Sequence, residues 1–474
     1  MEKGKFYITT TLPYVNANPH LGHAFELVEA DILARFKRSM GKDVFFNTGT
    51  DEHGLKVYRK AEERGEIVQN YCDACAENFR KLQKALNLSN NAFIRTTDNY
   101  HKEAAQEFWK RSFEAGDIYK KNYKVKYCVG CEMEKTDSDL TDGKCPEHPS
   151  LKIEIIEEEN YFFRFSKYKD KLIDFYEKNP DFVLPEKRFN EAKKFVASGI
   201  CDFSISRLKE KMPWGVSVPG DQDHVMYVWF DALVNYISTL GWPKDEEKFR
   251  AFWPGIQVAG KDNLRQQAVM WQAMLMSVGL PNTKQVIIHG FITSGGQKMS
   301  KTLGNVLDPF DIVERYSTDA LRYYLTREVS PFEDSDFTEE KFKEMYNSNL
   351  ANGLGNLTAR ILKMSESYLN APIADVDEDF PVEYKDFIEK FEFNKAMDFV
   401  WERISGMDKR IQETQPFKLI KTDKEKALGE IAGLTGELWN IADLIAPFMP
   451  ETSQKIKDAI KTNKMPEPLF LRKE

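Results

Sequence analysis

The sequence predicts an α/β fold in which a doubly wound parallel sheet is interrupted by an insertion and followed by an all-α helical bundle. Three observations support this prediction. Strand and helix patterns alternate over residues 1–118 and resume over residues 225–325. The intervening residues 119–224 form short polar and aromatic segments with a cluster of cysteines. After a linker at residues 326–345, residues 346–474 carry apolar side chains at helical spacing, which is typical of a bundle.

The first 55 residues are expected to form a strand, a helix and a second strand. Residues 6–11 and 44–48 are rich in β-forming residues, and the helix that begins at residue 21 has one apolar face. Such a βαβ unit is Rossmann-like, and ligands in these folds gather at the carboxyl ends of the strands. The polar residues that follow each strand are therefore candidates for a site.

The alternation resumes after the insertion. We expect a helix at residues 231–240, a short strand at 256–259, a helix that reaches residue 278, and a strand at 285–292. In the C-terminal region, apolar residues between 393 and 411 recur at spacings of four and three. That spacing predicts a packed helix of the bundle.

Length and composition indicate a multidomain globular protein. At 474 residues, two to four domains are expected, and 42% of the residues are apolar and 30% charged. No stretch approaches the roughly 18 uninterrupted apolar residues that a membrane span needs. The first five residues lead directly into a strand pattern with no signal-peptide core, so we expect a cytoplasmic location. The net charge of −8 argues only weakly against a nucleic-acid partner, because a local basic surface suffices to steer RNA.

Four residues of the insertion have the spacing of a zinc knuckle: Cys128-x2-Cys131-x13-Cys145-x2-His148. Two short chelating pairs can close a tetrahedral site, and four thiol or imidazole ligands leave no open position. One structural Zn²⁺ per chain is therefore predicted. A second C-x-x-C, at Cys72 and Cys75, has no second pair nearby, so we interpret it as two thiols on a helix.

Two short motifs predict a phosphate clamp. His20 and His23 open the first helix, and Lys298 and Lys301 follow a Gly-Gly turn after the strand pattern at 285–292. Imidazoles at a helix N-terminus and ammonium groups on a loop can hold a triphosphate. Taken singly, the first motif is better explained by a helix cap, and the second also fits a solvated turn. Their conjunction favours the clamp.

Both motifs, in this order and context, resemble those of the class I aminoacyl-tRNA synthetases. Residues 10–16, 47–54, 227–233 and 260–263 narrow the resemblance to the methionyl-tRNA synthetase family. The knuckle spacing also matches a one-zinc knuckle of that family. The resemblance runs from about residue 5 into the helical C-terminal region, so it covers nearly the whole chain.

The resemblance implies a set of site residues. Asp51 would pair with the α-ammonium group of methionine, and Arg207 would orient Asp51. The methionine side chain would lie against Leu12, Tyr14, Trp229, Ala232, Leu233, Tyr236 and Gln267. ATP would be bound by His20, Gly22, His23, Asp262, Lys298, Ser300 and Lys301, with His20, His23, Lys298 and Lys301 acting in catalysis. The anticodon would be read in the helical domain by Asn356, Arg360 and Phe417.

The sequence departs from the family pattern at three places. Gln266 and Gln267 stand where a bacterial pattern has Phe-His, and a glutamine amide can still donate a hydrogen bond to sulfur. Thr302 replaces a serine and keeps the hydroxyl. Phe417 replaces a tryptophan and keeps a face on which a base can stack, which contributes about 1–3 kcal/mol.

The activity that the resemblance implies is that of a methionine–tRNA ligase. ATP activates L-methionine to methionyl-adenylate, and the aminoacyl group then moves to the 3′-terminal adenosine of tRNA(Met). Mg²⁺ is expected with ATP. Because the chain ends at Glu474, without the extra tRNA-binding domain that makes some members dimers, a monomer is expected.

Three alternatives remain at this point. Another class I synthetase of the leucyl, isoleucyl or valyl type would need a larger editing insertion, and the cysteinyl enzyme is a further option. A non-catalytic tRNA-binding protein derived from a synthetase would have no need of both phosphate motifs. A nucleotidyltransferase of the same fold would lack the helical domain with Asn356, Arg360 and Phe417.

Overall fold

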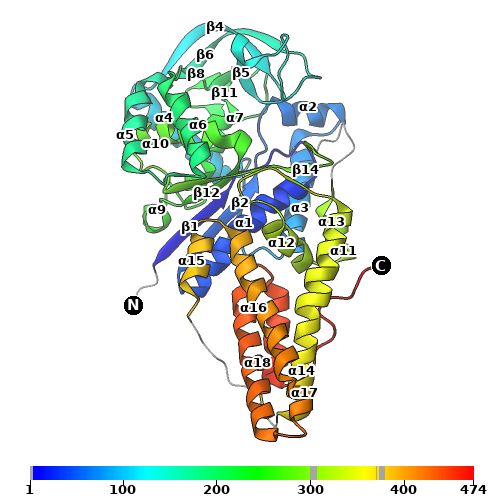
Figure 1. Cartoon of the computed structure of the whole chain (residues 1–474). Coiled ribbons are helices and arrows are strands. Elements are labelled where there is room, and N and C mark those ends of the chain that lie inside the picture. The colour runs from blue at the N-terminus through cyan, green and yellow to red at the C-terminus, as the bar shows by residue number, and fades with distance from the viewer. Residues whose placement is uncertain (1–3, 299–306, 370, 373–378) are drawn as a thin grey trace. The chain divides into compact units, whose positions relative to one another are not determined.

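The computed structural model describes residues 4–298, 307–369, 371–372 and 379–474 (Figure 1). The chain divides into two compact units. The first comprises Met1–Pro19, Gly41–Gln83 and Asn90–His289, and the second His20–Met40, Lys84–Ser89 and Gly290–Glu474. The domain boundaries expected at residues 118 and 224 fall within the first unit, and those at 325 and 345 within the second. The four-part domain division therefore stays a prediction.

The first unit is built on a six-stranded sheet whose pairings are all parallel, as the sequence predicts. In spatial order the strands are β3 (Ala92–Arg95), β2 (Asp43–Thr50), β1 (Lys5–Thr10), β12 (Ile256–Gly260), β13 (Gln285–His289) and β7 (Val183–Leu184). The chain order reverses between β1 and β12, where Thr10 pairs with Val258. In open α/β sheets, such a reversal opens a crevice at the carboxyl ends of the strands.

Helices pack this sheet into an aromatic-rich core. They are α2 (Leu55–Glu63), α3 (Val68–Ala85), α4 (Asn99–Glu114), α5 (Lys169–Lys178), α6 (Glu186–Ala197), α7 (Val228–Ala232), α8 (Asn235–Ser238), α9 (Glu246–Phe252) and α10 (Trp271–Ser277). Phe108 of α4 lies between Phe230 and Trp271, at 5.9 Å and 5.7 Å from the two ring centroids. These large buried rings supply much of the apolar area that holds the unit together.

The helix expected at residues 231–240 is divided into the two short helices α7 and α8. The amide of Val234 donates to the carbonyl of Asp231, a three-residue step tighter than an α-helix. The side chain of Asn235 donates to the carbonyl of Ala232 at 2.7 Å. Asparagine commonly competes with the backbone in this way, which explains the break. The helix expected to reach residue 278 likewise begins with a π-helical turn, Gln266–Met270, before α10.

The predicted insertion contains its own antiparallel sheet, in the order β5-β4-β6-β8. These strands are β5 (Met133–Lys135), β4 (Ile118–Cys128), β6 (Glu154–Phe163) and β8 (Phe203–Ser204). A second small sheet contains β10 (Ser217–Val218), β11 (Asp221–Met226) and β9 (Ser206–Leu208). The same segment also supplies β7 to the edge of the main sheet, beside β13.

The strand expected at residues 285–292 ends earlier, at His289. In the second unit, β14 (Ile292–Ser294) then pairs with β15 (Gln297–Lys298) and with β16 (Ser335–Asp336). Gly290 lies just before β14, and a Cβ atom there would come within 2.3 Å of the Glu333 carbonyl group. This close approach of two backbone segments requires glycine and separates β14 from the earlier strand.

The remainder of the second unit is helical, as predicted. Its helices are α1 (Leu21–Ser39), α11 (Pro309–Arg315), α12 (Thr318–Arg327), α13 (Glu339–Met345), a π-helical segment (Tyr346–Gly355), α14 (Asn356–Tyr368), α15 (Val382–Glu389), α16 (Phe393–Thr414), α17 (Pro416–Leu419), α18 (Lys424–Ile445) and α19 (Pro450–Thr462). The long helices α14, α16 and α18 run side by side (Figure 1). The apolar residues of α16 that the spacing singled out are buried.

Among the described residues, no helix is both long and apolar enough to cross a membrane.

Candidate functional site

The first wall of the predicted methionine site forms where β1 and β2 end. Tyr14 and Asp51 make a parallel β-bridge, in which the Val15 amide donates to the Asp51 carbonyl at 3.2 Å. The Tyr14 ring meets the Trp229 ring edge-on, with centroids 5.9 Å apart. The carboxyl ends of two neighbouring parallel strands and the helix α7 therefore bring these three predicted residues together. Leu12 lies in the same segment after β1 and is half-buried.

The second wall comes from α7, α8 and the π-helical turn. Ala232, Leu233 and Tyr236 are buried, as predicted for pocket residues. The Gln267 side-chain amide donates a 2.7 Å hydrogen bond to the Tyr236 hydroxyl. The preceding Gln266 has a different partner, because its amide donates to the Met133 sulfur at 3.4 Å.

Several polar atoms around these walls are buried without a hydrogen-bond partner among the described residues. They are the Tyr14 hydroxyl, the Trp229 indole nitrogen and the amide oxygen of Gln267. A buried polar group left unsatisfied costs about 1–3 kcal/mol. Such groups commonly mark a place where a ligand supplies the missing partner.

Asp51 is a buried carboxyl group, 2% exposed. Burial raises the pKa of Asp51 well above its usual range, and the neighbouring carboxylate of Asp231 raises it further. A hydrogen bond from the His53 backbone partly offsets these effects on the pKa of Asp51, and the Thr96 hydroxyl lies 3.5 Å from Asp51 Oδ1. A cation placed beside Asp51 would stabilise its charged form.

Asp231 is a second buried carboxyl group, whose surroundings favour the charged form. Burial would raise the pKa of Asp231, but His53 and His101 outweigh that effect and lower it. The Nδ1 atom of His53 is 3.0 Å from Asp231, and the Nε2 atom of His101 is 4.0 Å from it. His101 also contacts the Ser238 hydroxyl at 3.0 Å through Nδ1. The site thus contains two carboxyl groups whose environments shift their pKa values in opposite directions.

Arg207 is buried beside the site. Its guanidinium donates to the Ser204 hydroxyl at 2.8 Å and to the Ser206 carbonyl at 2.7 Å, and lies over the rings of Tyr127 and Tyr227. Action on Asp51, which the resemblance implies for Arg207, stays a prediction.

In the second unit, His20 and His23 form a capping box at the start of α1. His20 is the N-cap, and its Nδ1 accepts from the Gly22 amide at 3.0 Å. In return the His20 amide donates to Nδ1 of His23 at 3.2 Å, and the rings lie 3.8 Å apart. Since both Nδ1 atoms accept, the proton of each neutral ring is on Nε2. Desolvation lowers the pKa of His23 well below its usual value, and His20 lowers it further.

The lysine motif is only partly within the described residues. Gly295 and Gly296, at φ +61° and +73°, form the turn between β14 and β15, which confirms the predicted Gly-Gly turn. Lys298 ends β15, opposite Thr293. Ser300 and Lys301 lie outside the described residues. Asp262, in the first unit, is exposed just after β12.

The four residues of the predicted knuckle come together. One ligand atom from each of Cys128, Cys131, Cys145 and His148 lies within 4.8 Å of all the others. Cys131 Sγ is 3.4 Å from Cys145 Sγ and 3.2 Å from His148 Nδ1. Three thiols and one imidazole at these separations fit a tetrahedral Zn²⁺ site. A Cβ atom on Gly130 would meet the His148 ring at 2.5 Å, so the knuckle requires that glycine.

Two of the three predicted anticodon residues share a groove in the second unit. Arg360 of α14 and Phe417 of α17 line a cavity of about 590 Å³, together with Met364 and Ile411. The Phe417 ring is 44% exposed, and Arg360 pairs with Asp408 at 2.5 Å. Asn356 is exposed at the first turn of α14, four residues before Arg360.

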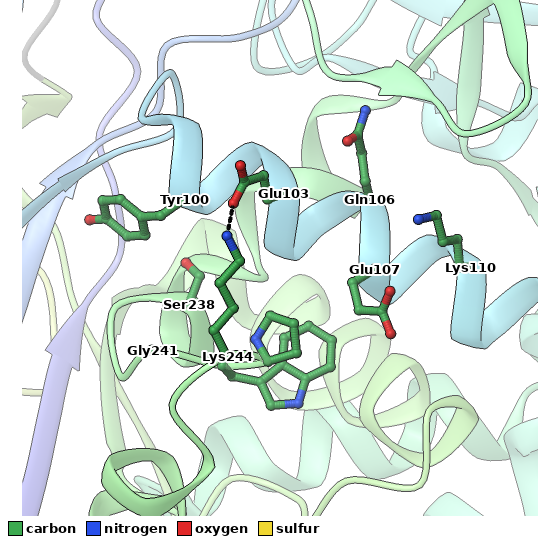
Figure 2. Close-up of a pocket in the computed structure, with 10 residues that line it drawn as sticks. Tyr100, Glu103, Gln106, Glu107, Lys110, Ser238, Gly241 and Lys244 are labelled. Atoms are coloured by element: carbon green, nitrogen blue, oxygen red, sulfur yellow. Dashed lines mark hydrogen bonds and ion pairs between the residues drawn. The ribbon is translucent and has the colours of Figure 1, made fainter.

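A further cavity of about 260 Å³ lies on the first unit, between α4 and the turn after α8 (Figure 2). Glu103 of α4 and Lys244 pair across it. None of the predicted binding residues lines this cavity, so it does not alter the assignment of the site.

Several neighbours of the site were not predicted from the sequence. Besides Asp231 and His101, they include His53, which contacts Asp231, Met133, which accepts from Gln266, and Glu132, which is buried beside the start of α2. His53 lies within residues 47–54, which resemble the family. Glu132 and Met133 lie between the knuckle ligands Cys131 and Cys145, where the sequence has no signal other than the cysteine spacing.

Comparison with known proteins gives consistent results. The family model described as "tRNA synthetases class I (M)" matches residues 6–362. A methionine–tRNA ligase of Thermotoga maritima is 43% identical over 471 residues, which cover 95% of this chain and 74% of that protein. The methionine–tRNA ligase of Rhizobium meliloti is 42% identical, with 96% of this chain and 91% of the relative covered. The structure of Mycobacterium tuberculosis methionyl-tRNA synthetase in complex with methionyl-adenylate superposes with a TM-score of 0.92 at 36% identity, covering 99% of this chain and 100% of that one.

Proposed function

The chain belongs to the class I tRNA synthetases of the methionine type, and from this premise we propose that it is a methionine–tRNA ligase. The substrates would be L-methionine, ATP with Mg²⁺, and tRNA(Met). The observation that carries the proposal is the junction of Tyr14, Asp51 and Trp229 at the carboxyl ends of β1 and β2. A buried carboxyl group beside two aromatic rings matches an amino acid that has an ammonium group and an apolar thioether side chain.

Asp51 would hold the α-ammonium group. Because burial and Asp231 raise the pKa of Asp51, its charged form is disfavoured in the empty site, and a bound cation would stabilise that form. The thioether would lie against Tyr14, Trp229 and Tyr236, since contacts between sulfur and aromatic rings contribute about 0.3–1.5 kcal/mol. Gln267 would act through Tyr236, to which its amide donates.

In the first step the methionine carboxylate would attack the α-phosphorus of ATP and release pyrophosphate. No protein nucleophile is needed, so catalysis comes from positioning and charge stabilisation. His20 and His23 would donate from Nε2 to the α- and β-phosphate region, because their Nδ1 atoms already accept backbone hydrogen bonds. Lys298 and Lys301 would hold the departing pyrophosphate. Gly22 would let the nucleotide approach the start of α1, and Asp262 and Ser300 would contact it as further ATP-binding residues.

In the second step the terminal ribose hydroxyl of tRNA(Met) would take the aminoacyl group. Asn356, Arg360 and Phe417 would read the anticodon, with the exposed Phe417 ring as a stacking surface. A Zn²⁺ ion held by Cys128, Cys131, Cys145 and His148 would be structural, because four protein ligands leave no position for chemistry. We further propose that the enzyme acts as a monomer in the cytoplasm.

Charging of a tRNA(Met) transcript tests the proposal as a whole. The purified protein is incubated with ATP, Mg²⁺ and methionine, together with either this transcript or one with an altered anticodon. Charging of the first and a loss of at least about 100-fold with the second would agree with anticodon reading by stacking and hydrogen bonds. Methionyl-adenylate formation without charging of any tRNA would contradict the second step.

A further inference from the structure

Glu132 is a buried carboxylate inside the knuckle, next to the ligand Cys131. Its side chain is 1% exposed, and its backbone has a φ of +53°. Residues other than glycine rarely adopt this left-handed conformation, and it persists only where the surroundings impose it. Since metal ligation requires only the cysteines and the histidine, the burial of Glu132 needs another explanation.

The Glu132 side chain caps the helix that follows Asp51. The N-cap of α2 is Gly54, which has no side chain to satisfy the first amides. Glu132 Oε1 accepts from the Lys56 amide, the second of the helix, at 2.6 Å. A Cβ atom on Gly54 would lie 3.2 Å from the same oxygen. A carboxylate at a helix N-terminus stabilises both the unpaired amides and the helix dipole, so Glu132 acts as an N-cap supplied from a distant part of the sequence.

Residues 132 and 133 contact two other walls of the site. The Tyr227 hydroxyl donates to the Glu132 carbonyl at 2.6 Å, and Tyr227 is the N-cap of α7, which carries Trp229. The next residue, Met133, accepts from Gln266 at 3.4 Å. The dipeptide 132–133 therefore contacts the start of α2, the start of α7 and the π-helical turn.

Tyr127 completes the arrangement, because its hydroxyl donates to Glu132 Oε2 at 2.5 Å. Both carboxylate oxygens of Glu132 thus accept hydrogen bonds, one from the hairpin of the knuckle and one from α2. Through these two hydrogen bonds Glu132 links the hairpin to the helix that begins four residues after Asp51.

We propose that Glu132 is a positioning residue of the amino-acid site, which fixes the loop that carries Asp51 by capping α2 from the knuckle. This inference rests on the proposed function, because it assigns Asp51 to the methionine ammonium group. It also gives the knuckle a role in amino-acid binding that is separate from holding the insertion together.

The test compares three variants of the full-length, zinc-replete protein. Glu132→Ala removes the cap, whereas Glu132→Gln keeps an oxygen to accept from Lys56. Glu158→Ala is the matched control, since Glu158 is a buried carboxylate of the same insertion that contacts Asn160 and Lys211 instead. Bound zinc and circular dichroism are recorded for each protein.

Two ligands distinguish an effect on the position of Asp51 from a general loss of order in the amino-acid site. One is methionine, and the other is its α-hydroxy analogue, which lacks the ammonium group. For Glu132→Ala we expect the KM for methionine in pyrophosphate exchange to rise about tenfold, with kcat and the KM for ATP changed by less than about twofold. The inhibition constant of the hydroxy analogue should change by less than about twofold, and Glu132→Gln should restore the KM for methionine to within about threefold of the original. Glu158→Ala should bind both ligands as the unaltered protein does.

The proposal is overturned if Glu132→Ala leaves the KM for methionine unchanged, weakens both ligands equally, or is not rescued by Glu132→Gln. If Glu132→Ala does not fold, Tyr127→Phe carries the test. It removes one hydrogen bond to Glu132, and we expect a rise of about threefold in the KM for methionine alone. An unchanged KM in Tyr127→Phe would then overturn the proposal. Absence of methionine-dependent exchange in the unaltered protein would instead reject the proposed function.

Discussion

The side-chain amide of Gln267 donates a 2.7 Å hydrogen bond to the hydroxyl of Tyr236. Both residues are buried, Tyr236 at 1% exposure on α8 and Gln267 at 1% on the π-helical turn. The family pattern has Phe-His at positions 266 and 267. Because the Tyr236 oxygen accepts from Gln267, its own proton is directed away from Gln267. In the proposed methionine site, the glutamine would therefore act by orienting a tyrosine.

Replacing Gln267 by leucine is expected to weaken the distinction between methionine and norleucine, which has a methylene group in place of sulfur. A site with oriented polar groups discriminates between isosteres better than an apolar one. The ratio of kcat/KM for methionine over norleucine should fall about tenfold. Pyrophosphate exchange with each amino acid measures this ratio. Gln285→Leu, which alters a glutamine bonded to the Asp181 carbonyl, should keep the original ratio, and an unchanged ratio in Gln267→Leu would contradict the role of the pair.

Methionine affinity should increase with pH. Burial, and then the charge of Asp231, raise the pKa of Asp51, so below this pKa the empty site has a neutral carboxyl group. Binding of the ammonium group requires the carboxylate and therefore releases a proton, and the affinity rises by at most about tenfold per pH unit until the pKa is passed. The free energy of unfolding of the empty protein should have the opposite trend with pH, because the folded site favours the neutral carboxyl group of Asp51. This contribution is fully present below the ordinary pKa of an aspartate and is lost as the pH rises through the raised pKa of Asp51.

Calorimetric titration with methionine, in buffers of different ionisation enthalpy, measures both the slope and the proton release. In Asp51→Asn the slope should disappear and the affinity should fall by at least about 100-fold, as for loss of a buried charge pair. An affinity that is constant or decreases with pH in the unaltered protein would show that Asp51 is already charged in the empty site.

The knuckle and the C-x-x-C motif of α3 should respond differently to substitution. Cys145→Ser is expected to lower bound zinc from about one atom per chain to nearly none, since structural zinc sites depend on all four ligands. Cys75→Ser should leave the zinc content unchanged, because Cys75 is buried on α3 away from a second chelating pair. Atomic emission spectroscopy measures the metal, and limited proteolysis should show faster cleavage within residues 119–224 of Cys145→Ser alone. Equal zinc loss in both variants would contradict the assignment.

Phe417→Ala should separate tRNA recognition from amino-acid activation. The exposed ring lines the groove with Arg360, and loss of a stacking surface costs about 1–3 kcal/mol. We expect kcat/KM for tRNA(Met) to fall about 10- to 100-fold, while methionine-dependent pyrophosphate exchange stays constant. Phe417→Trp, the residue of the family pattern, should charge tRNA at least as well as the original. Reduced exchange in Phe417→Ala would point to a structural defect instead.

The second unit should depend strongly on one buried ion pair. Arg322 of α12 and Asp31 of α1 are both fully buried, 2.8 Å apart, and Arg322 also donates to the carbonyls of Leu86, Pro447 and Phe448. Arg322→Met leaves Arg35, at 2.7 Å, as the remaining cation at Asp31 and removes the donor to the three carbonyls, so it should lower the free energy of unfolding by about 3–5 kcal/mol. The exposed pair of Arg315 and Glu339 provides the control, because Arg315→Met should cost less than about 1 kcal/mol. Urea unfolding measures the free energy of unfolding of both variants. Similar losses in Arg322→Met and Arg315→Met would contradict a special role of the buried pair.

Local patterns predicted much of this fold. The apolar spacing of α16 specified a packed helix, and the polar residues at the carboxyl ends of the first two strands, Asp51 among them, were expected to be candidates for a site. The knuckle was also predictable, because the two ligands of each chelating pair lie only three positions apart in the sequence. Its four ligand atoms do come together.

Other features depend on contacts between distant residues and leave no local pattern. The capping of α2 by Glu132 joins positions 76 residues apart, counted from Lys56. The pairing of β7 with β13 draws on a strand of two residues, too short for periodicity to reveal. The end of β13 before Gly290 follows from the close approach of residue 333. These relationships are set by tertiary packing, which overrides local propensity.

The most direct test of the central claim is ATP–pyrophosphate exchange measured with each of the twenty amino acids, using zinc-replete protein. We predict exchange with methionine alone, which would show that the site formed by Tyr14, Asp51, Trp229, Tyr236 and Gln267 selects methionine. Exchange supported by a different amino acid, or by none from folded protein, would contradict the assignment of this chain as a methionine–tRNA ligase.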